Sequence, residues 1–129
     1  MAAKRAVAFT VQEAIIGCGR ALKTEQQVAQ GLADALCAIY AMDSTLARAR
    51  VAGCGTIPTA IVRLVTHEGC ATVAGLTTEV VTHVVRDGQR ATKLAQLERL
   101  QTAHGAVVDV VDLRRQIADA VIEAGQYNL

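Results

Sequence analysis

Residue types that support covalent catalysis are sparse and scattered in this sequence. Ser44 is the only serine, and it falls in the middle of a long helical pattern. The histidines that would have to activate it stand far apart, at His67, His83 and His104. A Ser-His-Asp triad therefore has little support. We predict that the chain carries no catalytic residue and is not an enzyme by itself.

Metal and phosphate chemistry also lacks the required spacing. His67-Glu68 has no second histidine four residues after the first, which a helical zinc site needs. His67 and Cys70 share a helix face, which is more typical of a core cysteine beside a partly exposed histidine, with metal binding as the alternative. The Gly-Cys-Gly triplets at 17–19 and 53–55 lack phosphate-loop spacing, so we interpret them as helix breaks. We predict no metal site and no cofactor.

The carboxylates are spread among the predicted helices. We interpret Glu25, Asp34 and Asp43 as solvated or locally paired side chains. Because Asp43 lies on a mostly apolar helix, an ion pair with Arg63 or Arg86 is an alternative for it.

The cysteines and the N-terminal residues indicate a protein of the reducing cytoplasm. The four cysteines contain no CxxC pair, which favours small buried hydrophobes over a disulfide framework: Cys18, Cys37, Cys54 and Cys70. An apolar stretch at 6–17 is interrupted by Thr10, Gln12 and Glu13, which argues against a signal peptide or a membrane span. We predict a soluble, cytoplasmic chain.

Composition predicts one helical domain over residues 1–129. Apolar residues make up 52% and aromatics only 2%, so the core must consist of small and aliphatic side chains that suit closely packed helices. The formal charge is +1, with no basic run and no aromatic platform for bases. These features argue against a nucleic-acid partner.

The clearest helical pattern runs from about residue 25 to 51. Thr24 is placed as the N-cap with Gln27 as its capping-box partner, and Gly53 is placed to end the helix. Its apolar residues alternate spacings of four and three, as on one face of a helix: Val28, Leu32, Ala35, Ile39, Met42 and Leu46. A helix this long must pack that face against other helices or another subunit.

Four further helices complete an all-α, antiparallel bundle of four to five helices. The first spans 3–22, with Val7, Val11, Ala14, Ile15 and Leu22 facing inward. The next helix spans 58–86, with Pro58 in its first turn, and one face carries Val62, Val65, Val73, Leu76, Val80 and Val84. A shorter helix spans 89–103 and carries Leu94, Leu97 and Leu100. The last helix spans 113–124, is capped by Asp112 and ended by Gly125, and has Leu113, Ile117, Val121 and Ala124 facing inward. The β-branched runs at 79–85 and 106–111 leave a strand pairing open. We interpret the first as helix, because no turn residues interrupt 58–86, and the second as an extended connection.

Three segments carry a family resemblance. The first is QGLAD at 30–34, followed by AIYAMDS at 38–44 and LARA at 46–49. The second is the leucine-rich stretch from Gly88 to Leu100, and the third is RRQIADAVI at 114–122 through Gln126-Tyr127. Together they resemble the C-terminal helical extension of the very-long-chain type of acyl-CoA dehydrogenase. The resemblance covers residues 24–129, whereas 1–23 and Gly53–Pro58 show no family pattern.

The resemblance implies a packing role. Members of the family hold the FAD pocket, the acyl-CoA cleft and the catalytic glutamate in a dehydrogenase core upstream of this extension, so no site residue carries over to this chain. The extension packs over the core and is associated with subunit arrangement or membrane-surface attachment. We therefore predict a non-catalytic packing domain of an acyl-CoA dehydrogenase-type protein of fatty-acid oxidation. It would present its 28–46 or its 62–84 face to a dehydrogenase core or to a second copy.

The alternative is a stand-alone helical bundle that binds an acyl chain or another small apolar ligand. Its pocket would lie between helices and be lined by leucine, valine and cysteine.

Overall fold

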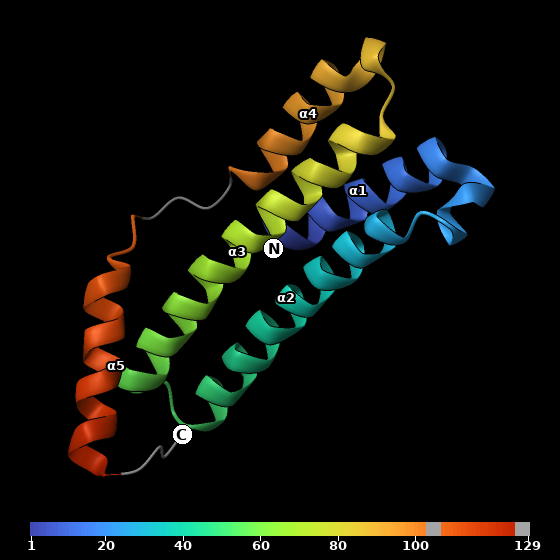
Figure 1. Ribbon diagram of the computed structural model, residues 1–129. Helices are drawn as coiled ribbons and strands as arrows, with labels where there is room; N and C mark the ends of the chain where they lie inside the picture. The colour runs from blue at the N-terminus through green and yellow to red at the C-terminus, as the bar shows by residue number, and fades with distance from the viewer. Residues whose placement is uncertain (103–106, 126–129) are drawn as a thin grey trace. The chain divides into compact units, whose positions relative to one another are not determined.

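A computed structural model describes residues 1–102 and 107–125, and these residues form five α-helices and a short 3₁₀ helix (Figure 1). In chain order the elements are α1 (Ala2–Cys18), η1 (Gly19–Lys23), α2 (Gln26–Val51), α3 (Thr56–Val84), α4 (Asp87–Gln101) and α5 (Val110–Ala124). No strand occurs in the described part of the chain, which confirms the all-α prediction. The β-branched run at 79–85 lies in α3 as far as Val84, so its interpretation as helix is confirmed.

The described residues group into two compact units. The first unit comprises residues 1–39 and 70–102, and the second comprises residues 40–69 and 107–125. Each of the long helices α2 and α3 contributes one part to each unit.

The first unit is an antiparallel bundle built from α1, the start of α2, the end of α3, and α4. Successive helices run in opposite directions (Figure 1). Its core consists of small and aliphatic side chains: Ala6, Ala14, Val28, Val80, Val81, Val84, Val85 and Leu97. Phe9, Cys18, Leu22, Leu32, Leu94 and Leu100 pack against this core and are partly buried.

Glycines allow the helices of the first unit to approach closely. A Cβ atom built at Gly17 of α1 would lie only 2.3 Å from the carbonyl oxygen of Val84 in α3. At Gly31 of α2, a Cβ would lie 3.1 Å from a methyl group of Val80. Gly17 is therefore a packing residue as well as a neighbour of the helix break, which comes at Gly19 with a φ of 54°.

The second unit is built from the end of α2, the start of α3, and α5. Its buried apolar side chains are Met42, Ala49, Ala60 and Leu113. Met42 lies over Gly69 of α3, where a Cβ would come within 2.8 Å of the Met42 side chain. An ion pair between Arg114 of α5 and Glu68 of α3 lies on the surface of this unit.

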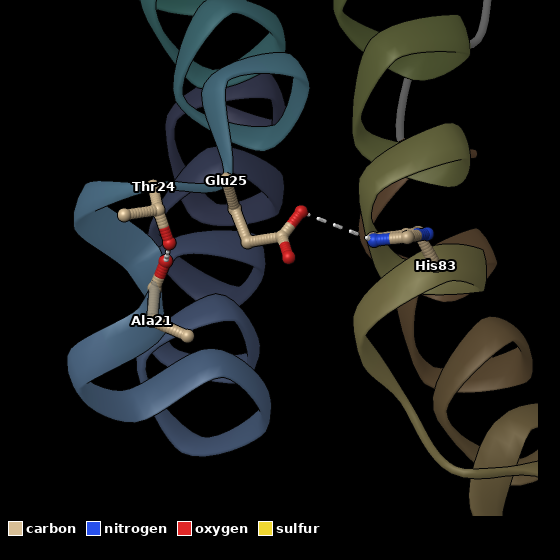
Figure 2. A network of polar contacts seen from close by, with 4 residues as sticks. All are labelled: Ala21, Thr24, Glu25 and His83. Atoms are coloured by element: carbon tan, nitrogen blue, oxygen red, sulfur yellow. Dashed lines mark hydrogen bonds and ion pairs between the residues drawn. The ribbon is translucent and has the colours of Figure 1, made fainter.

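Of the two predicted ends of α2, the C-terminal end is confirmed and the N-terminal cap is wrong. Gly53, with a φ of 84°, ends the helix as predicted. Its N–H donates to the Arg50 carbonyl at 3.2 Å, and the Cys54 N–H donates to the Ala49 carbonyl at 2.9 Å, which is a Schellman motif. The predicted N-cap at Thr24 was wrong, because the Thr24 hydroxyl donates backwards to the Ala21 carbonyl at 2.9 Å (Figure 2).

The last helix begins earlier than predicted. Asp109, and not Asp112, is the N-cap, and its carboxylate accepts the Asp112 N–H at 2.9 Å. Val110 and Val111 therefore belong to α5 and not to an extended connection. Gly125 ends the helix in the left-handed conformation, as predicted.

Three side chains predicted to face inward are exposed: Ile15, Leu46 and Ala124. On α1, the buried face includes Thr10 and Glu13, so a search for apolar residues alone places it incorrectly. On α2, a repeat of seven drifts around a helix of 3.6 residues per turn. Ala49 is buried near the end of that stripe, while Leu46 is 38% exposed.

Substitution of Gly17 by alanine is expected to destabilise the protein. The new methyl group collides with the Val84 carbonyl, and the loss should be about 1–3 kcal/mol in the free energy of unfolding. Gly75, in the middle of α3, is the matched control, because nothing lies within 4 Å of its Cβ position. There alanine should stabilise the helix by about 0.5–1 kcal/mol. Urea unfolding measures both, and equal effects of the two substitutions would contradict the packing role of Gly17.

Candidate functional site

The serine, histidine and cysteine residues that could support catalysis or metal binding do not form a cluster of metal ligands in the described part of the chain. Ser44 is half-buried on α2, and on α3 His67 is exposed and Cys70 half-buried. Among residues 1–102 and 107–125, no group of three or more His, Cys, Asp or Glu side chains is placed to hold a metal ion. His104 lies outside the described residues. The alternative ion pairs of Asp43 stay predictions.

The polar contact at one end of the first unit lies on the surface and is an ion pair only when the histidine is protonated. Nε2 of His83 in α3 lies 3.7 Å from Oε2 of Glu25, which immediately precedes α2 (Figure 2). Both side chains are largely solvated, so the pair contributes little to stability. Its open surroundings offer no enclosed reaction site.

The four cysteines are free thiols in two different environments. Cys37 and Cys54 are exposed, which corrects the prediction that all four are buried. Burial raises the pKa of the Cys70 thiol, and burial followed by the nearby charge of Glu25 raises the pKa of Cys18. A raised pKa keeps a thiol protonated at neutral pH, where it is a poor nucleophile.

A buried ion pair that was not predicted from the sequence joins α1 to α4 in the first unit. The Nζ atom of Lys93 donates to Oε1 of Glu13 at 2.8 Å, and the Glu13 side chain is only 5% exposed. Lys93 also lies 5.7 Å from the centre of the Phe9 ring. The signal was present, because Glu13 shares a helix face with Ala6 and Thr10, both of which are fully buried. This pair links α1 to α4 within the first unit.

Exposed apolar side chains lie along α2 beside its buried face. We call these side chains the outer stripe: in the first unit they are Ala33, Leu36 and Cys37, and in the second unit they are Tyr40, Ala47 and Val51, all exposed. Leu36 is 53% exposed, Tyr40 74% and Val51 91%. The predicted 28–46 face is instead mostly buried, and Val73, Val80 and Val84 are buried on the 62–84 face. The 28–46 face therefore packs within the units, which corrects that part of the prediction, whereas Val62, Val65 and Leu76 of the 62–84 face are only half-buried.

The second unit contains an open groove between the end of α2 and the start of α3. We call it the hairpin groove, and its volume is about 740 Å³. It is lined by Thr45, Arg48, Ala49, Val51 and Ala52 of the α2 side and by Pro58, Ile61 and Val65 of α3. The lining is mostly apolar but contains no leucine or cysteine, so it differs in composition from the predicted pocket. No described helix is long and apolar enough to cross a membrane.

The described residues form a helical domain with two exposed features, the outer stripe and the hairpin groove. Residues 2–99 match the family model described as acyl-CoA dehydrogenase, C-terminal domain, and the chain belongs to this family. The match includes residues 2–23, where no family pattern was predicted, and ends before α5. The chain therefore resembles the family through α1 as well as through α2. No curated protein matches the chain.

Removal of the Lys93 charge is expected to destabilise the first unit. Lys93→Met keeps the apolar stem but leaves the Glu13 carboxylate buried without its cation, which should cost about 1–3 kcal/mol. Arg114→Met is the matched control, because both members of the Arg114–Glu68 pair are well exposed. Its cost should stay below about 1 kcal/mol. Thermal unfolding compares the two, and a control as costly as Lys93→Met would overturn the assignment.

Proposed function

We propose that this chain is a non-catalytic packing domain of an acyl-CoA dehydrogenase-type protein of fatty-acid oxidation. Residues 1–129 act as one domain in the cytoplasm, and the relevant branch of the family is the very-long-chain type. FAD and acyl-CoA chemistry belongs to a dehydrogenase core, and this chain contributes no residue to it. Its function is to associate through a surface, and its partner is a second copy of the chain.

The outer stripe of α2 is the observation that carries this proposal. Within the segment AIYAMDS, Met42 is buried against Gly69, whereas Tyr40 is 74% exposed. The core of the second unit therefore accounts for Met42 but not for Tyr40. Tyrosine is enriched at protein interfaces, because it offers a large apolar area with few rotatable bonds and a polar tip.

The spacing of the outer stripe favours another helix as its partner. Ala33, Cys37 and Tyr40 alternate spacings of four and three, and Ala47 and Val51 continue the same repeat. Such a repeat produces the seam along which two helices pack, and the small alanine and cysteine side chains permit close contact. A second copy offers the same uncharged seam, and an isologous pair about a two-fold axis is the commonest soluble assembly.

Substitution of Tyr40 tests this proposal. Tyr40→Ser should weaken self-association by about tenfold or more, because central aromatic residues dominate interface energetics. Ile122→Ser on α5 is the matched control, since Ile122 is 75% exposed and lies outside the outer stripe and the family match. Sedimentation velocity over a concentration series measures both variants and the unmodified chain.

A chain that is monomeric at all concentrations would contradict the second-copy proposal. Binding of that monomer to an acyl-CoA dehydrogenase core, with loss of binding in Tyr40→Ser, would assign the stripe to the core instead. Equal effects of Tyr40→Ser and Ile122→Ser would show that the stripe has no special role.

A further inference from the structure

The hairpin groove combines two helix faces of the second unit. Thr45, Arg48, Ala49 and Ala52 follow the spacing i, i+3, i+4, i+7, which places them along one side of α2 and its end. On α3, Pro58, Ile61 and Val65 occupy one side in the same way. The Schellman motif at Gly53 turns the chain between these two walls. The volume of about 740 Å³ falls within the range of about 300–1,000 Å³ that small-molecule sites occupy.

The lining of the groove is apolar with one positive charge. Ala49, Pro58 and Ile61 offer only carbon atoms, and Arg48 is the one charged residue among the lining residues. In the described part of the chain, no carboxylate forms an ion pair with Arg48. Residues 44–67 contain three arginines and no aspartate or glutamate. The groove is therefore complementary to a molecule with an apolar body and a single anionic end.

We propose that the hairpin groove binds a free, single-chain anionic amphiphile, with its chain along Ala49, Pro58 and Ile61 and its carboxylate or phosphate headgroup paired with Arg48. Burial of the chain supplies the affinity, and the guanidinium supplies the orientation through charge-assisted hydrogen bonds. A free ligand fits better than a bilayer, because the groove is concave and bounded by a helix on each side, whereas lipid binding at an interface uses a broad apolar face.

Titration of the full chain with three ten-carbon ligands tests the headgroup. Decanoate and decyl phosphate, both below their micelle concentrations, should bind in a 1:1 ratio by calorimetry, and 1-decanol should bind more weakly. Arg48→Gln should weaken decanoate binding by about fivefold, the scale of an exposed ion pair. Arg50→Gln is the matched control on the same helix, because Arg50 does not line the groove, and it should leave the affinity unchanged.

Filling the groove tests the chain site. Ala52 is exposed and lines the groove, so Ala52→Phe blocks it without disturbing a core position. This should weaken decanoate binding by about tenfold, as expected if roughly two methylene groups are displaced. Ala118→Phe, at an exposed position of α5 outside the groove, should have no effect.

Three results would overturn the assignment. They are the absence of decanoate binding, binding that neither Arg48→Gln nor Ala52→Phe weakens, and binding only to vesicles of phosphatidylglycerol. Val51 belongs to both surfaces, but neither Arg48 nor Ala52 belongs to the outer stripe, so failure of the ligand-binding test is distinguishable from failure of the self-association test.

Discussion

The close approach of α1 and α3 at Gly17 is the contact on which the first unit depends. The Val84 carbonyl oxygen occupies the space that any other side chain at position 17 would need. This approach matters because the chain has few large side chains, with aromatics at only 2%. Alanine and valine fill the core only when the helices lie close together, and the core cluster consists largely of these two residue types. Glycine also permits close packing of α2 against α3 within each unit, at Gly31 in the first unit and at Gly69 in the second.

A core of small residues also explains how polar side chains come to lie inside it. Thr10 and Thr77 are buried, and each hydroxyl donates to a backbone carbonyl one turn earlier, at 2.8 Å and 2.6 Å. Glu13 is buried with Lys93 as its cation. These groups are satisfied within the unit, so they are structural and do not mark a reaction site. The exposed features of the described residues on which the proposals rest are the outer stripe of α2 and the hairpin groove.

The sequence predicted the helices well because their boundaries depend on local chemistry. Gly53 and Gly125 end their helices because each adopts a positive φ that glycine tolerates, and Pro58 falls in the first turn of α3 as expected. Which faces are buried could not be predicted as well, because that depends on distant partners. The buried Glu13 has Lys93 as its cation, and the two residues are 80 positions apart in the sequence. Thr24 is not the cap because α2 begins two residues later, at Gln26, and the Thr24 hydroxyl instead donates to the Ala21 carbonyl of the preceding turn. The outer stripe was not predicted, because the sequence of α2 contains two overlapping apolar repeats. Only the packing of the helices shows which of the two repeats is buried in the core.

Two native thiols measure directly whether a second copy covers the outer stripe. Cys37 belongs to the outer stripe, Cys54 lies at the turn after α2, and both are exposed and free. Alkylation rates of the two thiols, followed by mass spectrometry across a protein concentration series, compare the stripe with an internal reference. If a second copy covers the outer stripe, Cys37 reacts progressively more slowly as the protein concentration rises, while the rate for Cys54 stays constant. A Cys37 rate that is independent of concentration would contradict coverage by a second copy.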